Sequence, residues 1–269
     1  MKESKLMAAS NKRQMSKVSA TYIAIGVALI SLMTIIGTSA FLRTTEIRVE
    51  GASLYTVDEI IKSSGVSKGD NLLFVNAQNV SSSIRESLPF ISAAKVTRIP
   101  PDTVLIEVTE SGAIAAVTFS GELYAIDSAG RVLVKSTGGE TDQPGINFDD
   151  LIEIRGIEVE GAVIGNTLRS EFGAETKLQN MQDVLVALER EGLDKDVTYL
   201  DVSSISNIHF GFMSRYRVIL GGRSYLRQKL ERVISAVEEI EHRHPNTPGD
   251  INMSNVTDVS NEVSFRPTQ

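Results

Sequence analysis

The sequence has no cysteine, only three histidines, and none of the short motifs that mark many enzyme classes. Without cysteine the chain can form neither a disulfide bond nor a thiolate site, so an exported fold must depend on packing alone. No Walker sequence, no Gly-x-Gly-x-x-Gly and no His-Glu-x-x-His occurs. These absences argue against disulfide scaffolds, nucleotide-binding enzymes and zinc proteases.

Charged residues are also absent from one long stretch, Val18 to Leu42. As a helix with a rise of about 1.5 Å per residue, this stretch would be roughly 37 Å long, enough to cross a hydrocarbon core of about 30 Å. The rival interpretation is a signal peptide cleaved near Thr38-Ser39-Ala40. The stretch is longer than the apolar core of a signal peptide, usually about 7–15 residues. We therefore predict an uncleaved transmembrane helix at residues 18–42.

The charges on either side of this stretch predict its direction. Residues 1–17 contain one acidic residue, Glu3, and five basic ones: Lys2, Lys5, Lys12, Arg13 and Lys17. The positive-inside rule places this tail in the cytoplasm and the rest of the chain outside it. The rest is more acidic than the net charge of −7 for the whole chain, which argues against nucleic acid as the main partner.

Residues 44–112 form one predicted β-α-α-β-β unit. A strand at 46–50 alternates charged and β-branched residues. Thr56 and Glu59 have the spacing of a capping box for a first helix ending at Gly65, and Asn76 caps a second helix that ends before Pro89. Strands at 91–99 and 103–109 then form a hairpin.

Residues 113–269 form a predicted second domain, a mainly antiparallel β domain with two helices. A meander at 113–135 and a loop at 136–150 come first. A strand at 152–154 and a helix at 170–191 follow, and then strands at 197–202, 206–211 and 214–220. A helix at 224–243 and strands at 250–253 and 261–266 end the chain. The fold class is therefore α+β.

Three candidate chemical sites are better explained structurally. Ser92 and Lys95 have the Ser-x-x-Lys spacing of acyl enzymes, but in a strand they point to opposite faces, and the accompanying Ser-Asp-Asn and Lys-Thr-Gly motifs are absent. His242 and His244 lack a third metal ligand and suit a solvated helix end. Arg215 and Arg217 are predicted to share one side of a half-exposed strand. We therefore expect no catalytic site, no cofactor and no metal.

The order of these motifs resembles the bacterial FtsQ/DivIB cell-division family over nearly the whole chain. The similar segments are residues 47–51 (Ile-Arg-Val-Glu-Gly), 65–72, 88–91 (Leu-Pro-Phe-Ile), 100–103 (Pro-Pro-Asp-Thr), 108–110 and 124–132. Ser111 departs from the family pattern, which usually has Arg after Glu110. The resemblance implies a POTRA domain at 44–112 followed by a β domain of the FtsQ/DivIB type at 113–269.

The resemblance also implies a function. It indicates a non-enzymatic divisome scaffold in the cell membrane at the septum. Such a scaffold binds bitopic proteins of the FtsL and FtsB/DivIC type and thereby helps control septal peptidoglycan synthesis. Septal cell-wall synthases are further candidate partners.

The candidate binding site is the terminal strand, which would accept a partner strand along its edge. Its predicted contact residues are Tyr225, Glu262, Val263, Ser264, Phe265 and Arg266. Val263 and Phe265 would lie on one face, and Pro267 would end the pairing.

The alternative function is a membrane-tethered POTRA chaperone in protein export or outer-membrane assembly. Proteins of that class usually precede a large membrane β-barrel, and no long run of amphipathic strands of that extent occurs here. Copurification with barrel precursors rather than with division proteins would favour this alternative.

Overall fold

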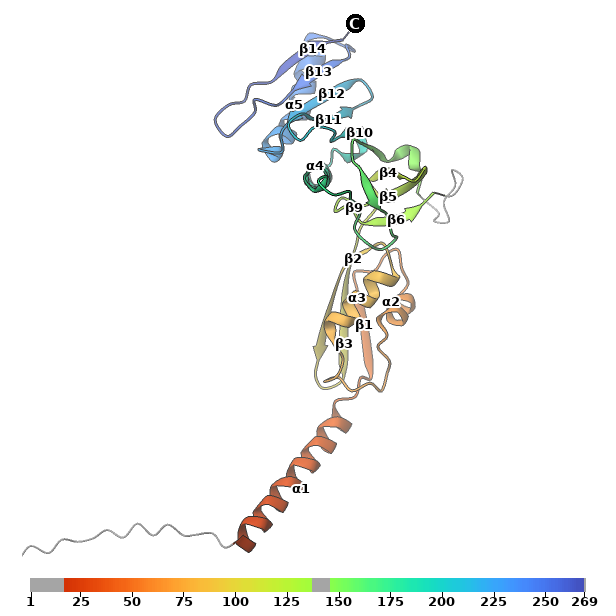
Figure 1. Ribbon diagram of the computed structural model, residues 1–269, viewed down its shortest axis with the longest axis vertical. Coiled ribbons are helices and arrows are strands. Elements are labelled where there is room, and N and C mark those ends of the chain that lie inside the picture. Colours follow the sequence, from red (N-terminus) through yellow and green to blue (C-terminus); the bar gives the residue numbers. More distant parts are fainter. Residues whose placement is uncertain (1–16, 137–145, 269) are drawn as a thin grey trace, which may run out of the picture.

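Figure 1 shows the chain as a computed structural model, in which a helix, a small domain and a larger domain follow one another. The structure describes residues 17–136 and 146–268, and within the first helix it describes no side chain at 17–20, 34–36 and 38–40. Nearly all of the predicted basic tail and most of the predicted loop at 136–150 lie outside the described residues. The first helix and the C terminus lie at opposite ends of the molecule (Figure 1).

The first helix, α1 (Lys17–Phe41), lies where the sequence predicts a hydrophobic helix. Large apolar side chains described along it, such as Ile25 and Met33, are exposed. Among the residues that the structure describes, no helix is both long and apolar enough to cross a membrane.

The small domain contains a three-stranded sheet with two helices, as predicted. In chain order its elements are β1 (Glu46–Glu50), α2 (Val57–Ser64), α3 (Ala77–Ser87), β2 (Ile91–Ile99) and β3 (Thr103–Glu110). β3 lies in the middle, parallel to β1 and antiparallel to β2. Ile60 of α2, Ile84 of α3 and Ile106 of β3 are fully buried in the shared core.

The local signals of the two small helices are confirmed. The Thr56 side chain accepts the Glu59 N–H and the Glu59 side chain accepts the Thr56 N–H, which is the reciprocal capping box. Gly65 ends α2 in the left-handed conformation, with φ +67°. Asn76 caps α3 by accepting two backbone N–H groups.

The larger domain contains a sheet of nine strands in the order β14-β13-β12-β11-β10-β7-β4-β5-β6. Five of its eight strand pairs are antiparallel. Buried side chains of the sheet pack with those of α4 (Glu175–Glu191) and α5 (Leu226–Arg243) in one core. The strands are β4 (Ala115–Phe119), β5 (Glu122–Ile126), β6 (Val132–Lys135), β7 (Ile152–Arg155), β10 (Val197–Asp201), β11 (Ile208–Phe212), β12 (Tyr216–Gly221), β13 (Gly249–Asn252) and β14 (Ser264–Pro267).

Two predicted boundaries in the larger domain are wrong. The helix predicted from residue 170 begins at Glu175, because β8 (Val159–Gly161) and β9 (Arg169–Ser170) form a short hairpin that was not predicted. The last strand, predicted at 261–266, begins at Ser264, because Asn261 pairs instead with Val256 in an isolated bridge.

A buried arginine joins the two domains. Arg131, just before β6, is 6 % exposed. Its Nε donates to the Pro89 carbonyl at 2.8 Å, and its Nη2 donates in a short contact to the Arg85 carbonyl. The Arg85 carbonyl lies in the last turn of α3, whose carbonyls have no intrahelical donors, and Pro89 follows the C-cap Leu88. The Ser111 hydroxyl adds a second link by donating to Asp127 at 2.9 Å.

Candidate functional site

The strand β14 forms one edge of the nine-stranded sheet and pairs only with β13 among the described strands. Ser264 lies opposite Asn252, Phe265 opposite Ile251, and the antiparallel register continues to the end of the strand. An edge strand of this kind has backbone N–H and C=O groups that another chain can bind.

The backbone hydrogen bonds show which groups of β14 point outward. The Thr268 N–H donates to the Pro248 carbonyl at 3.0 Å. In an antiparallel pair, residues alternate between bonding their neighbour strand and pointing away from it. By this alternation Phe265 directs its N–H and C=O to the open edge. Pro267 also faces outward but offers only a carbonyl, so an added strand would lose a hydrogen bond there.

The other edge of the same sheet is partly covered. The Val132 N–H of β6 donates to the Asn166 carbonyl at 2.9 Å, and the Gly165 N–H donates to the Val132 carbonyl at 2.8 Å. The segment around residues 165–168 therefore occupies backbone groups of β6. Among the residues that the structure describes, no such backbone bond occupies the outward groups of Phe265 in β14.

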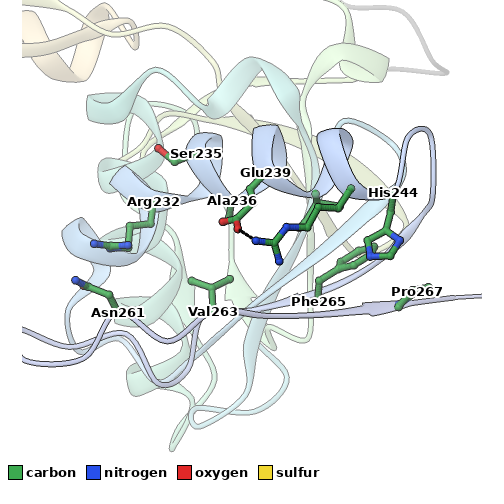
Figure 2. Close-up of a pocket in the computed structure, with 11 residues that line it drawn as sticks. Arg232, Ser235, Ala236, Glu239, His244, Asn261, Val263, Phe265 and Pro267 are labelled. Carbon is green, nitrogen blue, oxygen red and sulfur yellow. Dashed lines mark ion pairs between the residues drawn. The ribbon is translucent and has the colours of Figure 1, made fainter.

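A groove of about 470 Å³ lies between β14 and the C-terminal half of α5 (Figure 2). On the strand side Val263 and Phe265 line it. On the helix side Arg232, Glu239 and His244 are among the lining residues. The Phe265 ring packs against His244, with centroids 5.8 Å apart. The groove therefore combines an apolar floor with a charged rim.

The predicted contact residues fall into two groups. As predicted, Val263 and Phe265 are half-buried against the core on one face, while Glu262, Ser264 and Arg266 are exposed. Glu262 and Val263 precede β14 rather than belonging to it.

Tyr225 lies apart from these residues. It precedes α5 with a positive φ of +60° and does not line the groove. At about 1.5 Å per helical residue it stands roughly 28 Å along the axis from His244. The structure therefore does not bring it together with β14.

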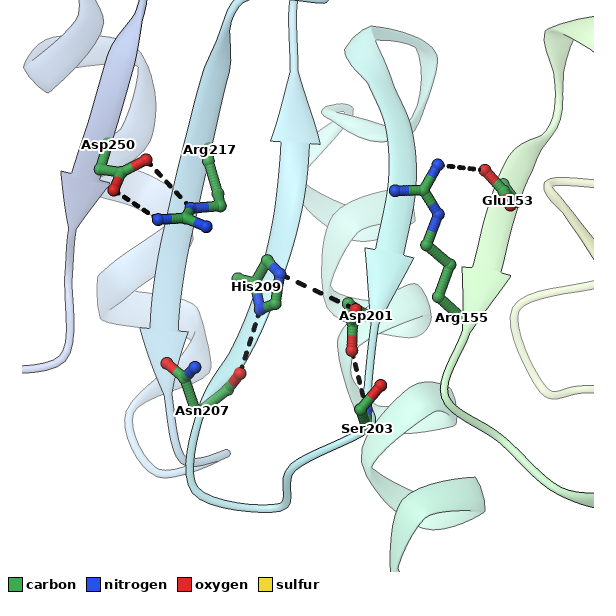
Figure 3. Close-up of polar contacts among 8 residues, drawn as sticks. All are labelled: Glu153, Arg155, Asp201, Ser203, Asn207, His209, Arg217 and Asp250. Carbon is green, nitrogen blue, oxygen red and sulfur yellow. Dashed lines mark hydrogen bonds and ion pairs between the residues drawn. The ribbon is translucent and has the colours of Figure 1, made fainter. Parts of the chain in front are cut away.

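The prediction for Arg215 and Arg217 is wrong for one of the two. Arg217 lies in β12 on the sheet face drawn in Figure 3 and pairs with Asp250 of β13, at 3.0 Å from its Nε. Arg215 lies in the turn before β12, where strand alternation does not apply. It pairs at 2.8 Å with Glu241 of α5. The same carboxylate accepts the Tyr216 hydroxyl, and burial together with this bond raises the pKa of Tyr216.

The sheet face drawn in Figure 3 carries paired polar side chains. Arg155 pairs with Glu153 and lies over the Tyr199 ring at 4.1 Å. His209 stands 3.9 Å from Asp201. These groups satisfy one another, as expected of a solvated sheet face.

The other discounted residues lie where a structural role explains them. Ser92 and Lys95 are both in β2. The Ser92 hydroxyl donates to the Thr109 carbonyl, and Lys95 pairs with Glu107 at 2.8 Å. His244 is the C-cap of α5 and is exposed, as predicted for a solvated helix end, and its ring also contacts Phe265. Within the described part of the chain, no group of three or more His, Asp or Glu side chains could hold a metal ion.

Comparisons with known proteins agree with this architecture. Residues 42–111 match the family of FtsQ-type POTRA domains. The chain is 23% identical to the cell division protein DivIB of Clostridium tetani, over 73% of this chain and 70% of that protein. It is 29% identical to the cell division protein FtsQ of an Anaeromyxobacter species, over 61% of this chain and 69% of that protein. It is also 36% identical to FtsQ of Bradyrhizobium diazoefficiens over a shorter stretch, 35% of this chain and 28% of that protein.

Proposed function

Because the chain belongs to the FtsQ/DivIB family of cell-division proteins, we propose that it is a non-enzymatic scaffold of the divisome. Its partners in this proposal are bitopic division proteins of the FtsL and FtsB/DivIC type, and through them it helps control septal peptidoglycan synthesis. The small domain, residues 44–112, and the large domain, residues 113–269, are the two extracytoplasmic units of this scaffold.

One observation carries the proposed mechanism: β14 ends the large sheet with outward backbone groups. A partner strand would pair with Phe265 by β-augmentation, and the groove beside α5 would take its side chains. The register of such a strand is limited by Pro267, which has no N–H to donate. Glu262, Ser264 and Arg266 would contact the partner from the exposed face.

We also propose that α1 anchors the protein in the cell membrane, with the N terminus in the cytoplasm and the protein concentrated at the septum. The charge-free stretch 18–42, the basic residues before it and the exposed apolar side chains of α1 support this proposal.

The test is copurification of the full chain with coexpressed FtsL and FtsB/DivIC proteins. Deleting residues 261–269 should abolish the complex while the small domain keeps its fold. Two substitutions distinguish the contribution of the side chain to binding from that of the backbone. Phe265→Ala removes only the ring, whereas Phe265→Pro also removes the outward N–H. A larger loss for the proline variant supports strand addition. Unchanged binding after the deletion would refute this site.

A further inference from the structure

Three large apolar side chains are exposed in two neighbouring segments of the POTRA domain. Phe74 is 84 % exposed, Leu73 55 % and Ile99 39 %. Leu73 and Phe74 are neighbours in the loop before α3, and the Arg98 side chain of β2 donates to the Leu73 carbonyl at 3.2 Å, so the end of β2 lies beside this loop. Ile99 follows Arg98 and points to the other face of β2. Single exposed apolar residues are common on protein surfaces, but a cluster of them indicates an interaction site.

This cluster lies at the end of the POTRA domain that adjoins α1 (Figure 1). The loop that carries it is bonded to the segment leaving α1. The Leu72 N–H donates to the Leu42 carbonyl at 2.8 Å, and the Thr44 N–H donates to the Asp70 carbonyl at 2.8 Å. The cluster is therefore held at a fixed position relative to the end of the helix.

Basic side chains surround the cluster. Arg43, Lys68 and Arg98 are exposed. None of the three takes part in an ion pair within the described residues. Arg98 donates one hydrogen bond to the Leu73 carbonyl, and its other N–H groups, like the charges of Arg43 and Lys68, can bind anionic groups outside the domain.

The acidic side chains at this end are engaged inside the domain. Asp70 accepts the Ser67 N–H at 2.8 Å, and Asp102 accepts the Thr45 hydroxyl in a short contact. Glu46 pairs with Arg48 at 2.7 Å. Each of these carboxylates therefore has a partner within the domain, although Asp70 and Glu46 remain exposed.

We propose that this end of the POTRA domain docks on the lipid bilayer. Leu73, Phe74 and Ile99 would enter the headgroup region, and Arg43, Lys68 and Arg98 would bind anionic headgroups. The proposal rests on the anchoring role proposed for α1, which brings this end to the membrane surface. Such docking restricts rotation of the POTRA domain about the anchor and so fixes the direction in which β14 extends from the membrane.

The chain has no tryptophan, so one introduced tryptophan reports on its own surroundings. Phe74→Trp is placed in the full chain, reconstituted in nanodiscs of phosphatidylethanolamine and phosphatidylglycerol with brominated acyl chains. Its emission should shift to the blue and lose intensity by bromine quenching. Phe172→Trp is the matched control, because Phe172 is fully exposed in the large domain. Its emission should show neither change.

A third variant, Met33→Trp, tests the anchor separately. If Met33→Trp is quenched and Phe74→Trp is not, α1 is in the bilayer and the docking is refuted, as expected if a protein partner covers the cluster. If neither variant is quenched, the proposed anchoring by α1 is refuted, and the docking that rests on it is refuted as well. Phe74→Trp is also measured together with the substitutions Lys68→Glu and Arg98→Glu. Weaker quenching in that variant supports the role assigned to the basic side chains, and unchanged quenching refutes it.

Discussion

Replacing Arg131 with alanine should loosen the joint between the two domains without unfolding either one. Arg131 donates to the Pro89 and Arg85 carbonyls. Each hydrogen bond from a charged donor contributes roughly 1.5–3 kcal/mol, and the two carbonyls would lose their protein donor in the variant. Part of this loss is offset, because a buried guanidinium has itself lost hydration, and burial already lowers its pKa.

We estimate the net cost at about 2 kcal/mol, which corresponds to roughly a 30-fold rise in the opening equilibrium of the joint. Hydrogen exchange measured on the full chain can detect this rise. The amides of residues 84–91 and 127–132 should exchange faster by that factor, while those of the β10–β12 core should not change.

The matched control is Arg227→Ala in the same domain. The Arg227 side chain is 69 % exposed and pairs with Glu231 one turn away, and an exposed pair of this kind contributes little to stability. The hydrogen-exchange rates of Arg227→Ala should match those of the parent protein. In Arg131→Lys, the amides at the joint should exchange at rates between those of the parent protein and those of Arg131→Ala. The single ammonium group of lysine lacks the planar fork with which arginine reaches both carbonyls. Exchange at the joint within about threefold of the parent protein in Arg131→Ala would refute the reasoning, since that is a change of well under 1 kcal/mol.

Three further outcomes are expected. Gly249→Ala should displace β14 and weaken partner binding, because a Cβ there would stand 2.5 Å from the Arg266 carbonyl oxygen and from the Phe265 ring; copurification measures the loss. Thr56→Ala should destabilise the POTRA domain by about 1 kcal/mol in urea unfolding, because α2 loses its cap. Lys229 is 3 % exposed, and burial lowers its pKa. At pH values between that lowered pKa and the usual pKa near 10.4, Lys229 binds a proton more fully in the unfolded chain than in the folded one. The free energy of unfolding of the large domain should therefore rise with pH in this range, and Lys229→Met should remove that pH dependence.

The POTRA domain could be predicted from the sequence because its signals are local. Thr56 and Glu59 lie three residues apart, Gly65 ends the same helix, and Asn76 starts the next. Each signal states where a backbone turn begins or ends without reference to the rest of the chain.

The errors lie where contacts distant in sequence decide the structure. Arg215 lies one residue before β12, and its direction depends on Glu241 of α5. The hairpin of β8 and β9, which delays the start of α4, depends on pairing across a loop that no periodicity reveals. The role of Arg131 was missed for the same reason, because its acceptors are backbone carbonyls more than forty residues away.

The joint at Arg131 matters for function because of where it stands in the molecule. The end of the POTRA domain beside α1 and the edge β14 lie on opposite sides of this joint (Figure 1). If the first is held at the membrane and the second binds division partners, the height and direction of the bound partner depend on the angle at the joint. A buried guanidinium bound to the Arg85 and Pro89 carbonyls holds that angle by directional bonds, whereas an apolar contact of similar size would permit sliding. If both proposals hold, Phe265 would control partner affinity and Arg131 partner placement. A variant at Phe265 should then change affinity and leave placement unchanged, and a variant at Arg131 should do the reverse.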